Sequence, residues 1–159
     1  MSTGGGSRQQ QQKVPNTLPD AAYGPAGRLN ANGVSESGDT NVSVIVNSGL
    51  KNFSLVGTLG TPQNAAETLL RLSIAPKDSG RVATLLNSFE DTDRNAYQFE
   101  YILDRGTRGP PLRNIAVIAA SSQGDAFYTL TVVAPDSEWE KEAVSIKLRK
   151  IASSFHLTV

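Results

Sequence analysis

Cysteine is absent from this chain of 159 residues, and histidine and tryptophan each occur once. Without cysteine the chain forms no disulfide, no thiolate metal site and no thiol nucleophile. The single histidine, His156, leaves neither a zinc site of the usual ligand types nor a Ser-His-Asp arrangement with a choice of bases. We therefore expect a binding protein and not an enzyme, and we interpret His156 as a surface or strand-edge residue.

The chain also lacks a surplus of charge, since 15 lysines and arginines balance 15 aspartates and glutamates. A general nucleic-acid binder normally carries a basic surplus that displaces counterions from phosphate, so we expect no nucleic-acid partner. No apolar run approaches the roughly 18 residues of a membrane-spanning helix. Residues 1–12 lack the apolar core of a secretory signal. We expect either a mature form with a new initiator methionine or a chain that has lost its targeting segment.

The length suits one domain, preceded by a polar arm. Residues 1–40 are rich in Gly, Gln, Pro, Asn and Ser and carry few large apolar side chains. Such a composition cannot offset the entropy of ordering the backbone, so we predict a disordered N-terminal arm over 1–40. Residues 41–159 are predicted to form the folded domain, which we expect to be a monomer when free.

Within 41–159 the periodicity alternates between that of strands and that of helices. The predicted strands are 41–47, 82–89, 97–103, 115–120 and 127–133. One helix is predicted to begin at Thr61-Pro62. A second helix is predicted to begin at Asp136, with Asp136 or Ser137 as its cap, and its apolar face carries Val144, Leu148, Ile151 and Phe155. The segment 115–120 is apolar on both faces, which indicates a central strand. This order predicts an α+β fold, an antiparallel sheet flanked by helices.

One basic cluster surrounds the Gly/Pro loop that follows the strand at 97–103. It comprises Arg105, Arg108 and Arg113, beside Asp104. Arginines on an exposed loop can dock onto an acidic protein surface, and loops often carry binding functions. The alternative is a solvated loop with an Asp104 ion pair that contributes little. Both interpretations stay open at this point.

Two other features have a structural and a functional interpretation. Glu90, Asp91 and Asp93 can offer oxygen ligands to calcium, but carboxylates that bound a turn are more often solvated turn formers. Trp139 can stack on a ligand, but a lone tryptophan near a helix start more often seals the edge of a core. We favour the structural interpretation of both.

Several short strings, in order, resemble those of the PsbP family. They are Asn41-Val42-Ser43-Val44, Gly60-Thr61-Pro62-Gln63, Ala96-Tyr97-Gln98-Phe99-Glu100-Tyr101, Phe127-Tyr128-Thr129-Leu130, Ala134-Pro135-Asp136-Ser137-Glu138-Trp139 and Ala152-Ser153-Ser154-Phe155. The resemblance covers about 41–159. Asp20-Ala21-Ala22-Tyr23-Gly24 also resembles the start of mature family members. There it helps attach the protein to photosystem II, which implies a docking role for Ala21, Ala22, Tyr23 and Gly24.

The resemblance implies an α-β-α sandwich and a non-enzymatic extrinsic subunit or assembly factor. Its expected place is the lumenal side of the chloroplast thylakoid, and its expected partner is the photosystem II core or another thylakoid complex. In that role the protein would support the oxygen-evolving complex. The alternatives are an assembly factor for photosystem I or the chloroplast NADH dehydrogenase-like complex, and a soluble module that binds a GTPase through the same fold.

The chain departs from the family pattern in two respects. A first hairpin that family members place before the strand at Asn41 is missing. The sheet is therefore expected either to lack an edge pair or to be rebuilt by the arm. A histidine that many members carry near Asn114 is also absent. We therefore expect no resident cofactor, and we assign calcium or manganese association, which the family implies, to no residue.

Overall fold

The structure, a computed structural model, describes residues 21–23, 28–29, 35–36 and 40–158. The strands in these residues are β1 (Ala21–Tyr23), β2 (Arg28–Leu29), β3 (Ser35–Glu36), β4 (Asn41–Ser48), β5 (Val82–Asp91), β6 (Ala96–Asp104), β7 (Leu112–Ala120) and β8 (Ala126–Pro135). The helices are α2 (Pro62–Leu69), α3 (Asp136–Trp139) and α4 (Glu142–Ser154), with shorter helical turns η1 (Leu55–Leu59), η2 (Leu70–Ile74), η3 (Thr92–Arg94) and η4 (Gly106–Arg108).

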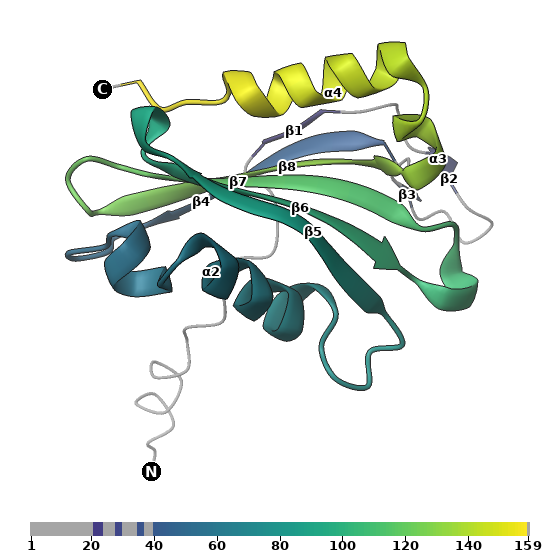
Figure 1. The fold of residues 1–159 in the computed structure, drawn as a ribbon, viewed down its shortest axis with the longest axis horizontal. Coiled ribbons are helices and arrows are strands. Elements are labelled where there is room, and N and C mark those ends of the chain that lie inside the picture. Colours follow the sequence, from purple (N-terminus) through teal and green to yellow (C-terminus); the bar gives the residue numbers. More distant parts are fainter. Residues whose placement is uncertain (1–20, 24–27, 30–34, 37–39, 159) are drawn as a thin grey trace.

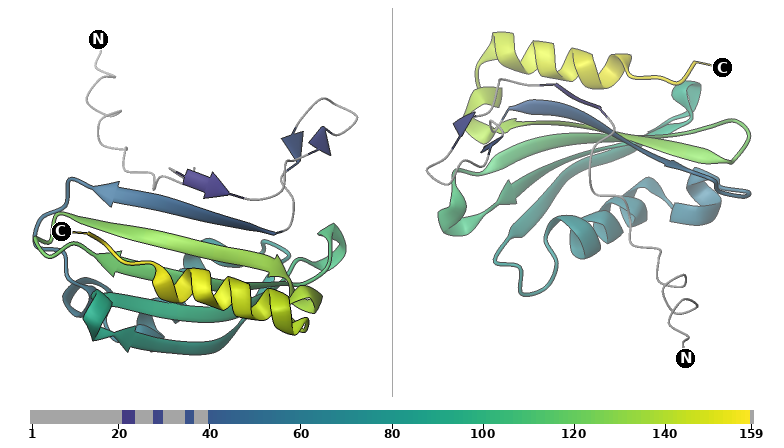
Figure 2. Two further views of the ribbon diagram at one scale, coloured as in Figure 1. Left: turned by 90° about the horizontal axis from the view of Figure 1, so that it is seen from above. Right: turned by 180° about the vertical axis from the view of Figure 1, so that it is seen from behind.

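Six of the strands form one antiparallel sheet in the order β1-β4-β8-β7-β6-β5. Strands β2 and β3 pair separately. Helix α2 and its neighbouring turns cover one face of the sheet, and α3 and α4 cover the other (Figure 1). Figure 2 shows the same layers from above and from behind. The predicted α+β fold, an α-β-α sandwich, is confirmed.

Strand β7 lies in the middle of the sandwich and is buried on both faces. Ile115, Val117 and Ala119 point into the core beneath α4. The alternate residues of the same strand point into the core above α2, as the two-residue period of a strand requires. The prediction of a central strand at 115–120 is therefore confirmed.

The core on the α2 side is built from aromatic side chains of β6 and the loops beside it. Tyr97, Phe99 and Tyr101 alternate along β6 and are almost completely buried. Phe53 and Phe127 stack with ring centroids 4.7 Å apart. This stack holds the loop after β4 against the β7–β8 turn.

The β7–β8 turn fits that loop closely at Gly124. The Phe53 N–H donates to the Gly124 carbonyl at 2.9 Å. Gly124 has a positive φ of 73°, and a Cβ there would lie 3.0 Å from the Phe53 carbonyl oxygen. Only glycine satisfies both the backbone conformation and the close approach.

Helix α2 begins as the sequence predicts. The Thr61 side chain accepts from the Asn64 N–H at 3.2 Å, and Pro62 occupies the first helical position. Immediately before this helix, the Tyr97 hydroxyl donates to the Gly60 carbonyl at 2.7 Å. That bond fixes the entry of α2 to the central part of the sheet.

The C-terminal helix differs from the prediction in its start. A single helix capped by Asp136 or Ser137 was expected, but the chain forms α3, breaks, and resumes as α4. Neither side chain caps α3, because the Asp136 carboxylate binds Arg113 at 2.8 Å instead. The predicted apolar face of α4 is confirmed, and it packs on the sheet through Val144, Leu148, Ile151 and Phe155.

Arg94, in the turn between β5 and β6, joins that turn to the end of α4. Its Nη1 donates to the carbonyls of Ala152 at 2.8 Å and Phe155 at 3.0 Å. Its Nε donates to the Asp91 carboxylate at 2.7 Å, and its Nη2 donates to Gln98. A cation here also complements the negative end of the helix dipole.

The N-terminal segment contains structure that its composition does not predict. Strand β1 lies within the predicted arm 1–40 and pairs with β4, with Ala22 opposite Ser43. It forms the edge of the sheet, so the sheet is rebuilt there by the segment that precedes β4. The prediction for the rest of 1–40 concerns residues outside those described, apart from the short β2–β3 pair.

We expect Tyr97→Phe to lower the free energy of unfolding by about 1–2 kcal/mol, since it leaves the Gly60 carbonyl without its donor. Urea denaturation measures this loss. Tyr128→Phe is the matched control, because no acceptor for the Tyr128 hydroxyl lies among the described residues, and it should change stability by less than about 0.5 kcal/mol. Equal effects of the two variants would contradict the assigned role of the Tyr97 hydroxyl.

We expect Arg94→Lys to loosen the end of α4, because an ammonium cannot reproduce the forked contacts of the guanidinium. Hydrogen exchange should accelerate by about tenfold for amides of the last turn of α4, while amides of β7 keep their protection. Arg108→Lys serves as a comparison, because Arg108 lies in the β6–β7 loop, away from the end of α4. Unchanged exchange near Ala152 would show that Arg94 does not hold the helix end.

Candidate partner-binding surface

The β6–β7 loop, which contains Arg105 and Arg108, is ordered by contacts within itself. The Asp104 carboxylate accepts from the Gly106 N–H at 2.8 Å. The Arg105 guanidinium donates to the Pro110 carbonyl through Nε at 3.1 Å and Nη2 at 2.8 Å. The loop therefore presents a defined shape, and Arg105 contributes to that shape from inside.

Arg113 lies apart from this exposed loop, on strand β7. Its Nε donates to Asp136 at 2.8 Å, and its Nη1 lies 3.3 Å from Glu100. The side chain is 25% exposed. The sequence placed Arg105, Arg108 and Arg113 in one cluster, but the structure places the Arg113 guanidinium in an internal ion-pair network between the sheet and α3.

Glu100 on β6 is the centre of this network. Its two carboxylate oxygens accept from Arg149 on α4 at 2.8 and 3.1 Å, a bidentate pair, and Arg113 approaches the same carboxylate. Burial alone would raise the pKa of Glu100, but the hydrogen bonds and charges of Arg149 and Arg113 outweigh burial, and the pKa lies below its ordinary value. Glu100 is thus held ionised between two cations.

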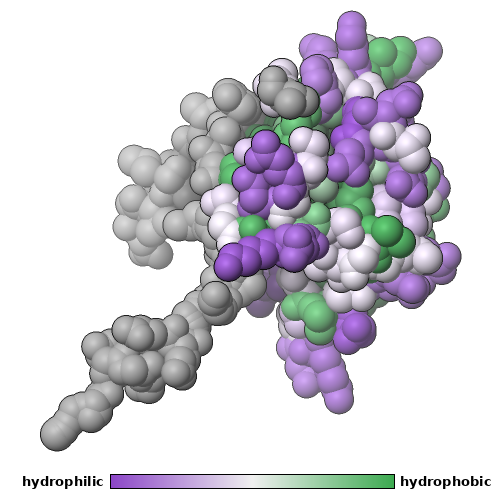
Figure 3. All heavy atoms as spheres, turned by 90° about the vertical axis from the view of Figure 1, so that its left-hand side faces the viewer, coloured by the Kyte–Doolittle hydropathy of each residue, from purple (hydrophilic) through white to green (hydrophobic). Residues whose placement is uncertain are grey.

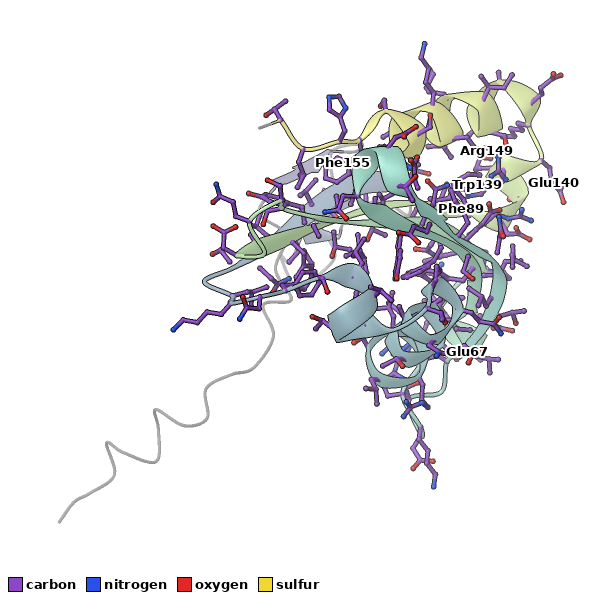
Figure 4. The ribbon with its side chains drawn as sticks, turned by 60° about the vertical axis from the view of Figure 1, so that its left-hand side comes forward. Glu67, Phe89, Trp139, Glu140, Arg149 and Phe155 are labelled. Atoms are coloured by element: carbon purple, nitrogen blue, oxygen red, sulfur yellow. The ribbon has the colours of Figure 1, made fainter. Side chains whose placement is uncertain are left out.

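Trp139 completes the contact between α3, α4 and the sheet. Its Nε1 donates to the carbonyls of Arg113 at 3.1 Å and Ala134 at 3.3 Å. The Arg149 guanidinium lies 5.4 Å from the ring centroid, within the range of a cation–π contact. Figure 4 shows Trp139 and Arg149 together on this side of the sheet, with Glu67 on the opposite layer. The tryptophan is 5% exposed, in agreement with a role in the core.

Arg108 is the member of the predicted cluster that stays open to a partner. It is exposed in η4, and no acceptor for its guanidinium lies among the described residues. Glu140, at the end of α3, is also exposed (Figure 4). A partner that approaches this end of the molecule would meet a guanidinium on a shaped loop and acidic side chains on α3.

Of the four predicted docking residues near the N-terminus, three have a described backbone. Ala21, Ala22 and Tyr23 form β1 at the edge of the sheet. Gly24 lies outside the described residues. The docking role of this segment remains a prediction.

The predicted acidic cluster, Glu90, Asp91 and Asp93, lies at the β5–β6 turn. Asp91 accepts from the Arg94 backbone N–H and side chain, which supports the interpretation of Asp91 as a turn former. Within the ranges described above, no group of three or more His, Asp or Glu side chains is placed to hold a metal ion. None of the described helices is long and apolar enough to cross a bilayer.

A groove of about 690 Å³ lies beside the same turn, between η3, the β7–β8 hairpin and the tail after α4. His156, Tyr128 and Asp93 line it. Two polar side chains of the lining have partners within the chain: Asn95 donates to the Ala120 carbonyl at 3.0 Å, and the Ser121 hydroxyl donates to Asp125 at 2.8 Å. Figure 3, which faces this end of the molecule, shows mostly polar side chains with small apolar patches between them.

Sequence reasoning missed the groups that join the layers. Glu100 and Arg149 are 49 residues apart, and Arg149 lies in none of the strings that resemble the family. Only Glu100 carried a sequence signal for such a role, because it is a charged residue in the strand with the clearest alternation of apolar and polar residues. Together, the fold and this surface define a small α-β-α sandwich domain whose clustered charges mainly stabilise its own packing.

The comparisons with known proteins agree with that class. The PsbP family model matches residues 14–157. The protein "CyanoP" of Thermosynechococcus vestitus is 37% identical over 120 residues, which cover 72% of this chain and 63% of the relative. The chloroplastic "PsbP-like protein 1" of Arabidopsis thaliana is 32% identical over 120 residues, which cover 74% of this chain and 48% of the relative.

A solved structure shows the same fold. The solution structure of cyanobacterial PsbP (CyanoP) from Synechocystis sp. PCC 6803 matches with a TM-score of 0.60 at 21% identity, over 76% of this chain and 68% of that one. The chain belongs to the PsbP family. The family match begins at residue 14 and therefore includes β1, whose residues lie in the string Asp20-Ala21-Ala22-Tyr23-Gly24 that resembles the start of mature family members.

We expect Glu100→Gln to destabilise the protein by about 2 kcal/mol at neutral pH, less than for a fully buried pair because Arg149 is half exposed to solvent. Folding lowers the pKa of Glu100. The stabilisation that its ionised carboxylate provides is therefore complete above the ordinary pKa of 4.5 and is lost as the pH falls towards the pKa in the folded protein. Denaturation of both proteins across this pH range measures the difference. A difference that grows as the pH falls would contradict the network.

Proposed function

We propose that this chain is a non-enzymatic extrinsic protein of photosystem II on the lumenal side of the thylakoid membrane, where it supports the oxygen-evolving complex. Membership of the PsbP family over residues 14–157 is the observation that carries the proposal. The similarity to CyanoP of a cyanobacterium and to a chloroplastic PsbP-like protein supports a place in a photosynthetic membrane system. The match covers 63% of the length of CyanoP and 48% of the length of PsbP-like protein 1, so the proposal concerns only the domain that this chain shares with them.

The arrangement of charged side chains supports binding over catalysis. Glu100, Arg113 and Arg149 are paired with one another, and Arg94 is bonded to a carboxylate and to helix carbonyls. Groups engaged in this way hold elements together and are not placed to exchange protons with a substrate. The exposed groups that remain, such as Arg108, are suited to contacts with another protein.

The proposed partner is the photosystem II core, reached through the loop that carries Arg105 and Arg108 and through the segment around Ala21–Tyr23. Arg105 keeps the loop in shape through its bonds to Pro110, and Arg108 supplies the charge. Exposed charge pairs of this kind bind reversibly and weaken with salt. A peripheral, salt-sensitive association is therefore the expected mode of attachment.

Rebinding to thylakoid membranes that have been washed free of extrinsic proteins with salt tests the proposal. We expect saturable binding to photosystem II-enriched membranes that high salt releases, and weaker binding when residues 1–27 are deleted. Arg108→Gln should weaken binding roughly threefold, whereas Lys147→Gln, a change on the exposed side of α4, should have no effect. Absence of saturable binding by a folded protein would overturn the assignment, and binding to photosystem I membranes alone would favour the assembly-factor alternative.

A further inference from the structure

A second groove, of about 440 Å³, lies between helix α2 with η2 and the edge of the sheet at β5. Its apolar lining comes from Leu70, Ala75, Val82, Ala83 and Leu85, and its charged lining comes from Glu67, Arg71 and Arg81. Two arginines against one glutamate leave the lining with a net positive charge. The groove is on the opposite layer from the Glu100 network (Figure 4).

The two arginines of this groove differ from those that stabilise the fold. Arg94, Arg113 and Arg149 each bind a carboxylate of the chain. No carboxylate or carbonyl among the described residues accepts from the side chains of Arg71 or Arg81. The Nε of Arg81 is buried and has no hydrogen-bond partner. A buried guanidinium donor without an acceptor is costly, so this site is suited to an incoming anion.

Strand β5 provides an open edge beside these arginines. It is the last strand of the described sheet, so no described strand pairs with its outer side. Edge strands are commonly guarded by charged residues or proline, but residues 82–86 carry neither. Val82 is 65% exposed and Leu86 is 44% exposed. The pairing of β5 with β6 shifts register between Leu85 and Asn87, so the regular stretch of β5 beside the groove is Val82–Leu85.

The alternation of side chains relates the edge to the groove. Ala83 and Leu85 line the groove, and Arg81 precedes them at the same two-residue spacing. A strand added to the outer side of β5 would direct every second side chain towards the same face. A carboxylate at one of those positions would lie next to Arg81. Small apolar side chains two residues before and after it would then contact the apolar lining of the groove.

We propose that the groove between α2 and β5 binds an extended acidic peptide segment of another protein, which adds as a strand to Val82–Leu85 and places a carboxylate between Arg71 and Arg81. Backbone hydrogen bonds to the edge provide affinity, and the arginine pair selects for the acid. The proposal does not depend on the photosystem assignment, because it concerns the chemistry of the segment and not the identity of the protein that carries it.

The test uses the full chain labelled with ¹⁵N and the peptide acetyl-Ser-Val-Thr-Glu-Thr-Val-Ser-amide, whose glutamate and two valines share one face. We expect saturable shifts of the Val82–Leu85 amides in NMR titrations. Replacing glutamate by glutamine in the peptide should weaken binding about tenfold, as loss of a charge-assisted pair of about 1.4 kcal/mol does. This comparison is made on the unmodified protein, so it does not depend on the folding of a variant.

Arg81→Gln and Arg71→Gln should each reduce the preference for the glutamate peptide over the glutamine peptide. Lys147→Gln, the removal of an exposed cation on α4, should leave that preference unchanged. A peptide with N-methylated backbone amides should not bind.

Three outcomes of these titrations would overturn the proposal. They are equal binding of the glutamate and glutamine peptides, binding of the N-methylated peptide, and reproduction of the shifts by acetate alone, which indicates an adventitious ion only. Concentration-dependent dimerisation through β5 without peptide would identify a second copy as the occupant and would also overturn it.

Discussion

Strand β7 is buried on both faces, and the helices on either side of the sheet are held in place by that burial. A strand of isoleucine, valine and alanine in the middle of a sheet exposes apolar surface to water on two sides unless a helical layer covers each side. Helix α2 and its turns cover one face, and α4 covers the other. The sandwich is thus a consequence of residues 115–120, and the other strands extend the surface on which the helices pack.

Apolar packing alone does not fix where each helix lies, and polar contacts provide that precision. On the α2 side the Tyr97 hydroxyl binds the carbonyl that precedes the helix. On the α4 side Glu100 binds Arg149, and Arg94 binds the helix end. Because the interior is poor in water, each of these groups is costly when its partner is removed. The charges of Glu100, Arg94 and Arg149 are used in this way.

The proposed binding surfaces therefore lie at the margins of the sandwich. The β6–β7 loop, strand β1 and the groove along β5 all lie where the layers end, and each offers backbone or charge that the core does not use. This distribution is typical of a domain that acts through contact, since loops and edges tolerate change without disturbing the packed centre. It is also consistent with the proposal of a peripheral protein that attaches to a larger complex.

Elements with a local signal could be predicted from the amino-acid sequence alone. The alternation along 97–103, the two-sided apolar run at 115–120, the Thr61-Pro62 helix start and the apolar face of α4 depend on neighbours in the chain, and all appear in the structure. Tertiary structure decided the contacts between residues distant in sequence, such as Glu100 with Arg149 and Arg94 with Ala152, 58 residues away. It also moved Arg113 and Asp136 from predicted loop and cap positions into one ion pair. A charged side chain takes whichever partner the fold brings within a few ångströms, and sequence spacing does not contain that information.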